Sequence, residues 1–85
     1  MTSKCPVCSS ELDFEPWVGG SGSQEICTSC GIQFGYNDAR ADLRQRIYSL
    51  WREAWIANGR RAFHGDSWHD VSARIAQIAG EKNAV

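Results

Sequence analysis

Four cysteines are the residues of this sequence whose type and spacing indicate chemistry. Cys5 and Cys8 form one C-x-x-C pair, Cys27 and Cys30 form a second, and 18 residues separate the two pairs. Two turns of this kind can bring four thiolates around one tetrahedral metal ion, with zinc–sulfur distances of about 2.3 Å. Because a catalytic zinc keeps an open position and four cysteines leave none, we expect one structural Zn²⁺ ligated by all four.

Two other uses of four cysteines stay open at this stage, namely two disulfide bonds or an iron ion. A redox function is disfavoured for either pair. Redox-active C-x-x-C motifs place a cysteine of low pKa at the N-terminus of a helix in a thioredoxin-like βαβ unit. Cys5 precedes no helical pattern, and Cys30 runs into the segment GIQFGY, which has the alternation of a strand. The metal is therefore expected to stabilise the fold.

The segments around the cysteines predict short strands. With 85 residues the chain suits one small domain, and a core of that size benefits from a metal. The segments ELDF and SQEIC have the spacing of half-buried strands, and Ile32, Phe34 and Tyr36 alternate on one face. The run GGSGS marks a bend between strands. We therefore predict a zinc ribbon of short antiparallel strands over residues 1–37.

From Asp38 onward the apolar period becomes helical, which predicts a long amphipathic helix over residues 38–59. Asn37 or Asp38 can cap its start, and Gly59 after Asn58 can end it. We expect its apolar face to pack against the ribbon. That face comprises Leu43, Ile47, Leu50, Trp51 and Ala54.

A loop and a second, short helix are predicted over residues 60–80. This helix should run from Trp68 to about Ala79, with Ser67 as N-cap and Gly80 at its end. Its apolar face comprises Val71, Ile75, Ile78 and Ala79. Residues 81–85 are expected to form a frayed tail. The fold class is thus α+β, a zinc ribbon followed by two α-helices, in a single domain over residues 1–85.

Charge is distributed unevenly along the chain. Residues 1–42 carry two basic and six acidic side chains, a formal net charge of −4, whereas residues 43–85 carry seven basic and four acidic ones, which gives +3. Four thiolates around one Zn²⁺ would bring the first half to about −6. Because phosphate binding needs clustered Lys and Arg, this charge disfavours nucleic acid as the ribbon's partner.

Location follows from two further features of the sequence. The N-terminal segment MTSKC lacks the apolar core of a signal peptide, and no stretch approaches the roughly 20 apolar residues that a membrane span needs. We therefore expect a cytoplasmic protein that does not bind membranes. In that reducing setting, paired cysteines hold metal more often than disulfides.

Aromatic residues are the other candidates for function. The chain has four tryptophans, and Trp51 lies on the predicted core face of the first helix. Trp17 can cover the ribbon and Trp55 can line the edge of the core face, and both are also candidates for a partner-binding surface together with Glu15 and Glu25, since aromatic side chains anchor protein interfaces as well as fill cores. The group His64, Asp66 and His69 does not have the i, i+4 spacing of ligands on one helical face, and we assign it no function.

Three segments resemble a known group of proteins. CPVC, SQEICTSCGIQFGYNDA and LRQRIYSLWREAWIANG are similar to small, mostly bacterial zinc-ribbon-like proteins of unassigned function, of the Cys-rich CPCC-like type, with the pattern C-P-x-C, E-I-C-x-x-C and W-I-x-x-G. The likeness covers roughly residues 5–59. It implies metal binding by the four cysteines and no established activity; some of these proteins are suspected to be immunity factors against toxins of competing bacteria.

These observations lead to two hypotheses of different classes. The first is a non-enzymatic structural-zinc protein that binds a protein partner, possibly a toxin, as an immunity or antitoxin-type factor. It rests on the closed metal site, the absence of a nucleophile near His64 and His69, and the negative ribbon. The alternative is a nucleic-acid-binding zinc ribbon that uses the arginine-rich helical half, with Arg44, Arg46, Arg52, Arg60 and Arg61.

Overall fold

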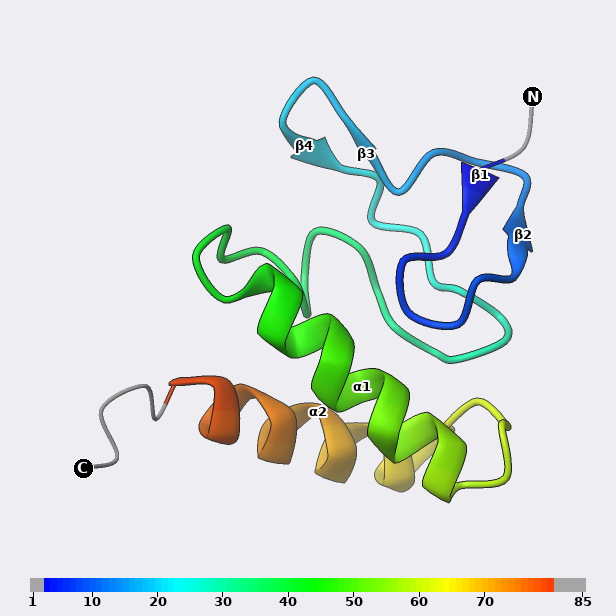
Figure 1. Cartoon of the computed structure of the whole chain (residues 1–85), viewed down its shortest axis with the longest axis vertical. Coiled ribbons are helices and arrows are strands. Elements are labelled where there is room, and N and C mark those ends of the chain that lie inside the picture. Colours follow the sequence, from blue (N-terminus) through cyan, green and yellow to red (C-terminus); the bar gives the residue numbers. More distant parts are fainter. Residues whose placement is uncertain (1–2, 81–85) are drawn as a thin grey trace.

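The computed structural model describes residues 3–80 and has the predicted α+β fold. Figure 1 shows the strands and the cysteine-bearing loops above α1, with α2 along the lower side of that helix. In chain order the elements are β1 (Ser3–Lys4), β2 (Glu11–Leu12), β3 (Trp17–Val18), β4 (Ser21–Gly22), α1 (Arg44–Ala57) and α2 (Gly65–Gly80). The predicted tail, residues 81–85, lies outside the described residues.

Each sheet is a single antiparallel pair of two-residue strands. In the first, β1 pairs with β2, so that Ser3 lies opposite Leu12. In the second, β3 pairs with β4 across a tight turn made by Gly19 and Gly20, both at positive φ. The predicted bend in GGSGS is therefore the turn of a hairpin. The predicted strands SQEIC and GIQFGY form no regular sheet: they pair at one isolated bridge, between Ile26 and Gln33, and through flanking backbone hydrogen bonds such as that from the Cys27 N–H to the Ile32 carbonyl at 2.9 Å.

The predicted alternation of Ile32, Phe34 and Tyr36 on one face is wrong at its last residue. Ile32 and Phe34 are fully buried, but Tyr36 is 63% exposed. The chain turns at Gly35, whose φ of 93° favours glycine. A Cβ atom on Gly22 would collide with the backbone of Gly35, so the β3–β4 hairpin lies directly against this turn. The close approach of two glycines thus ends the strand pattern.

The start of the first helix was also predicted wrongly. Helix α1 begins at Arg44, not near Asp38, and its N-cap residue Leu43 makes no side-chain capping hydrogen bond. Its end agrees with the prediction, since Asn58 is the C-cap and Gly59 follows at a φ of 75°. Asp38 does not cap the helix because its carboxylate is fully buried and accepts hydrogen bonds from elsewhere.

Asp38 joins the hairpin, the turn and α1. Its carboxylate accepts hydrogen bonds from Trp17 Nε1 at 2.9 Å, from the Gly35 N–H at 2.6 Å and from the Tyr48 hydroxyl at 2.6 Å. Burial and this bond to Asp38 raise the pKa of Tyr48. Arg44 donates its Nε–H to the Asp38 carbonyl at 3.0 Å and places its guanidinium 3.9 Å from the ring centroid of Trp17.

Helix α2 begins earlier and is longer than predicted. It spans 16 residues from Gly65, against 14 in α1, so it is not the shorter helix. The N–H of Trp68 donates to the His64 carbonyl, which means that the predicted N-cap, Ser67, already lies inside the first turn. Asp66 lies in that first turn, where its negative charge interacts favourably with the positive end of the helix dipole. The start of α2 is therefore stabilised without Ser67 as its N-cap.

One apolar core connects the ribbon and both helices. The predicted faces are confirmed in their main residues: Leu43, Ile47 and Trp51 of the first face are buried, with Leu50 and Ala54 packed against them. The same holds on α2 for Val71, Ile75 and Ala79. They meet Val7, Leu12, Ile32 and Phe34 from the ribbon. Within residues 3–80, neither helix is long and apolar enough to span a membrane.

The buried carboxylate generates a first prediction. Asp38→Ala leaves three donors without an acceptor in a buried place, so we expect the free energy of unfolding to fall by about 3–5 kcal/mol. Asp13→Ala, which removes an exposed carboxylate of the same half, should change it by no more than about 0.5 kcal/mol. Urea unfolding of the metal-loaded variants measures both. Equal midpoints for the two variants would contradict the role given to Asp38.

Candidate metal centre

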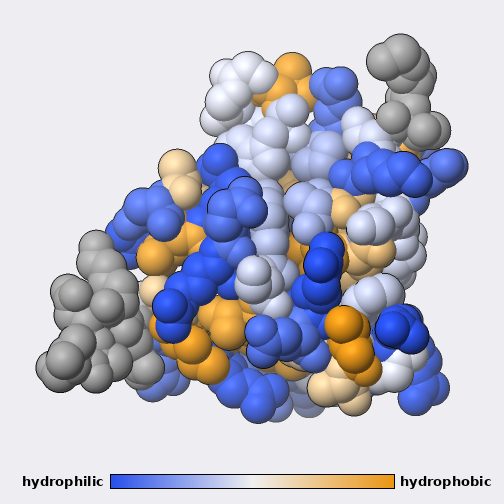
Figure 2. Space-filling view, in the orientation of Figure 1, coloured by the Kyte–Doolittle hydropathy of each residue, from blue (hydrophilic) through white to orange (hydrophobic). Residues whose placement is uncertain are grey.

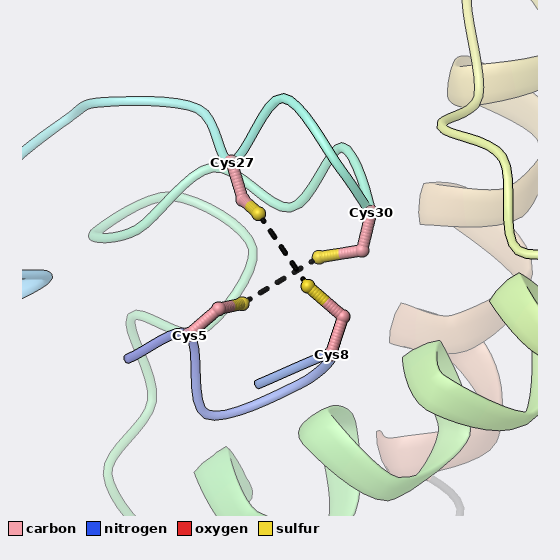
Figure 3. A group of neighbouring side chains, drawn as sticks. All are labelled: Cys5, Cys8, Cys27 and Cys30. Carbon is pink, nitrogen blue, oxygen red and sulfur yellow. Dashed lines mark hydrogen bonds between the residues drawn. The ribbon is translucent and has the colours of Figure 1, made fainter. Parts of the chain in front are cut away.

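The four cysteines converge on one point. Figure 3 shows their side chains directed at one another from two loops. All four Sγ atoms lie within 4.8 Å of one another, and the pairs Cys5–Cys30 and Cys8–Cys27 are each 3.7 Å apart. A tetrahedron with metal–sulfur distances of about 2.3 Å has sulfur–sulfur edges of about 3.8 Å. The cluster therefore has the size and donor number of a site that could hold a metal ion.

Two matched turns position the sulfur atoms. In the first, the Ser9 N–H donates to the Cys5 carbonyl at 2.9 Å; in the second, the Gly31 N–H donates to the Cys27 carbonyl at 2.7 Å. Each turn ends in a residue at positive φ, 66° at Ser9 and 83° at Gly31. Gly31 adopts this conformation without strain because it has no Cβ. Ser9 adopts it as well, at a backbone cost of about 1–2 kcal/mol.

The electrostatics of the cluster depend on how closely the thiols lie. Hydrogen bonds from the Cys30 and Cys5 thiols lower the pKa of Cys27 to about 2. The bond to Cys27 in turn raises the pKa of Cys5 to about 12, and it raises that of Cys30 as well. One thiolate is thus stabilised by its neighbours, and a cation is needed to stabilise four.

Outer contacts orient individual ligands. The backbone N–H of Val7 points at Cys5 Sγ from 3.4 Å. Cys8, the one ligand that is not fully buried, has its Sγ 3.1 Å from the Ser10 hydroxyl, which can donate to the sulfur once it is a thiolate. The four cysteines are free thiols, so the structure contains none of the disulfides left open by the sequence.

Three tryptophans bind the backbone of the second turn. Its amides face inward, so its carbonyl groups face outward and need donors from elsewhere. The indole N–H groups of α1 and α2 supply a donor to each of three consecutive carbonyls. The pairs, donor first, are Trp55 to Ser29 at 2.8 Å, Trp51 to Cys30 at 2.7 Å and Trp68 to Gly31 at 2.7 Å. We call these three side chains the indole clasp.

The first turn is held by α1 as well. Arg52 donates its Nε–H to the Val7 carbonyl at 2.7 Å, although the two residues are 45 positions apart in the chain. Together with the indole clasp, this bond fixes both cysteine turns to the helices. The roles of Arg52, Trp51, Trp55 and Trp68 as hydrogen-bond partners of the cysteine turns were not predicted from the sequence. The spacing of Trp51 and Trp55, i and i+4 on one helical face, was the available signal.

The residues predicted to bind a partner have different surroundings. Glu15 and Glu25 are exposed. Trp17 and Trp55 are half-buried, and both use their indole N–H groups inside the protein, on the Asp38 carboxylate and the Ser29 carbonyl. Both tryptophans therefore have structural roles, and their assignment to a partner-binding surface stays a prediction.

No second metal cluster is formed by the described residues. Within residues 3–80, Cys5, Cys8, Cys27 and Cys30 make up the one group of three or more potential ligands that lie close together. The ring of His69 packs edge-on against Trp68 at 5.2 Å, so this histidine takes part in aromatic packing.

Comparisons of the chain with family models, curated proteins and solved structures find no match. The site is therefore interpreted from its own geometry.

The indole clasp generates a second prediction. Trp51→Phe keeps an aromatic ring but leaves the buried Cys30 carbonyl without its donor, which should lower the free energy of unfolding by about 1–3 kcal/mol. Because that carbonyl belongs to Cys30, one of the candidate metal ligands, metal affinity should fall about 10- to 100-fold, as it does when other hydrogen-bond partners of ligand residues are removed. Competition with a coloured chelator, under conditions where the protein stays folded, measures the affinity.

Trp17→Phe is the matched control, because its indole N–H binds Asp38 and not a cysteine turn. It should lower stability and leave the chelator competition within about threefold of the unmodified protein. A similar loss of metal affinity in both variants would mean that the indole hydrogen bonds to the cysteine turn have no specific effect on the metal site.

Proposed function

We propose that this chain is a non-enzymatic structural-zinc protein that binds a protein partner, as a factor of the immunity or antitoxin type. The observation that carries the structural-zinc part of the proposal is the closed cluster of four cysteine sulfurs, joined to both helices through the backbone of its own turns. A metal in such a cluster has all its tetrahedral positions filled by the protein. The metal then stabilises the fold, and a partner must be bound elsewhere on the surface.

The donor set supports zinc as the metal. Soft thiolates favour zinc or iron among the common metals, and tetrahedral geometry suits both. Zinc has no redox chemistry, which suits a buried site with a structural role, and structural Cys₄ sites are typical of zinc. The resemblance to bacterial zinc-ribbon-like proteins, which rests partly on the same cysteines, is consistent with zinc and motivates the immunity-type role, and it stays a prediction.

The use of the cysteine turns supports a protein partner over a nucleic acid. The carbonyls of Ser29, Cys30 and Gly31 are already bound by the indole clasp, so those backbone groups are not free to contact bases. The ribbon exposes acidic side chains, which repel phosphates and attract a basic protein surface. These are Glu11, Asp13, Glu15 and Glu25.

The arginines of the helical half give limited support to the alternative. Arg44 contacts Trp17 and the Asp38 carbonyl, and Arg52 binds the Val7 carbonyl. Both therefore contribute to the fold first. Arg46, Arg60 and Arg61 are exposed and would have to carry any binding to phosphates.

A third prediction concerns the metal. The purified chain should contain one zinc per molecule, and removal of zinc should unfold it, because structural zinc supplies about 10–16 kcal/mol in comparable small modules. Elemental analysis gives the metal and its ratio, and circular dichroism during chelation follows the fold. Replacement by Co²⁺ should give the absorption bands of a tetrahedral tetrathiolate complex. A metal-free preparation with an unchanged melting temperature would contradict the structural role.

A fourth prediction separates the two functions. The zinc-loaded chain should bind random single-stranded or duplex nucleic acid more weakly than about 10 μM at 150 mM salt, measured by fluorescence anisotropy. Immobilised chain should capture a protein from a lysate of its source organism, and the capture should survive nuclease treatment.

Tight nucleic-acid binding with a steep salt dependence would favour the alternative function. The triple variant Arg46→Ala/Arg60→Ala/Arg61→Ala then serves as the control: it should abolish that binding if these exposed arginines carry it. Under the proposed function, the same variant leaves protein capture unchanged.

A further inference from the structure

Two hollows adjoin one stacked aromatic pair, the exposed Tyr36 and the half-buried Trp68. The first, of about 430 Å³, lies between the second cysteine turn and the start of α2, and the second, of about 500 Å³, lies between the turn after Phe34 and α2. His69 lines both. We call the surface that includes both hollows the aromatic face, and its main residues are Ile26, Gln33, Tyr36, Phe63, Trp68 and His69.

The aromatic face exposes large side chains in fixed positions. Tyr36 is 63% exposed and stacks on Trp68, with ring centroids 6.2 Å apart and planes 21° apart. Trp68 is itself fixed by its bond to the Gly31 carbonyl. Ile26 is 50% exposed and is held by its bridge to Gln33. Rigid aromatic groups next to a hollow are the usual anchors of protein interfaces.

Other exposed apolar side chains lack these surroundings. Single apolar residues are normal on a protein surface, and in the view of Figure 2 they form small separate patches among hydrophilic ones. Val18, which is 60% exposed, is such a residue on the β3–β4 hairpin. It matches Tyr36 in exposure and lines neither hollow of the aromatic face, so it is a suitable control.

The charges around the aromatic face are negative. No Lys or Arg lines either hollow. Along α2, residues three and four apart form rows, and the exposed Asp66 and Asp70 share a row with Ala73, which lines the second hollow. Arg74, four residues after Asp70, is also a neighbour of that carboxylate, but it lies farther round the helix from Ala73 and lines a different hollow. Glu25 is exposed and precedes Ile26 in the chain.

We propose that the aromatic face binds a peptide segment of a partner protein in which a large apolar side chain is flanked by Lys or Arg. The apolar side chain enters the hollow beside Trp68 and packs on Ile26 and Phe63, while the cations lie near Asp66, Asp70 and Glu25. This inference rests on the proposed function, and it moves the partner site from Trp17 and Trp55 to Tyr36 and Trp68. It also makes the site dependent on the second cysteine turn, which supplies Ile26 and Gly31.

The test uses the zinc-loaded full chain and a displayed library of random 12-residue peptides. Selected peptides should share a large apolar residue with Lys or Arg within a few positions. Tyr36→Ser and Ile26→Ser should each weaken a selected peptide about tenfold or more, whereas Val18→Ser should leave it within about twofold. Asp66→Asn/Asp70→Asn should weaken it severalfold and reduce the salt dependence of binding. Circular dichroism and zinc content verify that each variant is folded.

Four outcomes would overturn the proposal. Selected peptides without basic residues would remove the charge argument. Binding that Tyr36→Ser leaves unchanged would place the site elsewhere, and concentration-dependent self-association abolished by Tyr36→Ser would make a second copy the occupant. A lysate partner captured equally by Tyr36→Ser would also overturn it while leaving the proposed function intact. Failure of both the library and the lysate capture would count against the proposed function itself.

Discussion

Four sulfur atoms within 4.8 Å of one another set the main constraint on this small protein. As thiolates they repel each other strongly, and only a cation at their centre turns that repulsion into attraction. The sheets of the ribbon contribute little to its stability, because each strand is two residues long and such pairs contribute few hydrogen bonds. The two cysteine turns are separated by 18 residues in sequence and meet through their side chains. The path of the backbone around them is set by that meeting.

The helices depend on the same turns through the backbone. A turn that directs its amides toward sulfur leaves its carbonyls facing outward, and an uncovered row of carbonyls would be costly at a buried surface. The indole clasp satisfies three in succession while its rings fill the core between the ribbon and the helices. Ribbon and helical pair are thus one cooperative unit. The same three side chains thus donate hydrogen bonds to the cysteine turn and fill the apolar core.

Local patterns in the sequence were sufficient where a residue's role depends on its near neighbours. The spacing of the cysteines predicted the cluster, and the periodicity of Ile47 and Trp51 predicted the buried face of α1. The start of α1 was predicted wrongly because Asp38 has the chemistry of an N-cap, yet its carboxylate binds Trp17 and Tyr48, which are 21 and 10 positions away. The roles of Trp55 and Arg52 were missed for the same reason, since local spacing does not identify a carbonyl acceptor 26 or 45 residues distant.

The order of the parts along the chain has a consequence for biosynthesis. All four cysteines precede α1, so during translation the complete ligand set leaves the ribosome before either helix. A metal ion captured at that moment would shape the two turns and present the row of carbonyls on which Trp51, Trp55 and Trp68 later dock. If the cluster binds a metal during synthesis, a cell short of that metal would produce chains whose amphipathic helices have no ordered surface to cover.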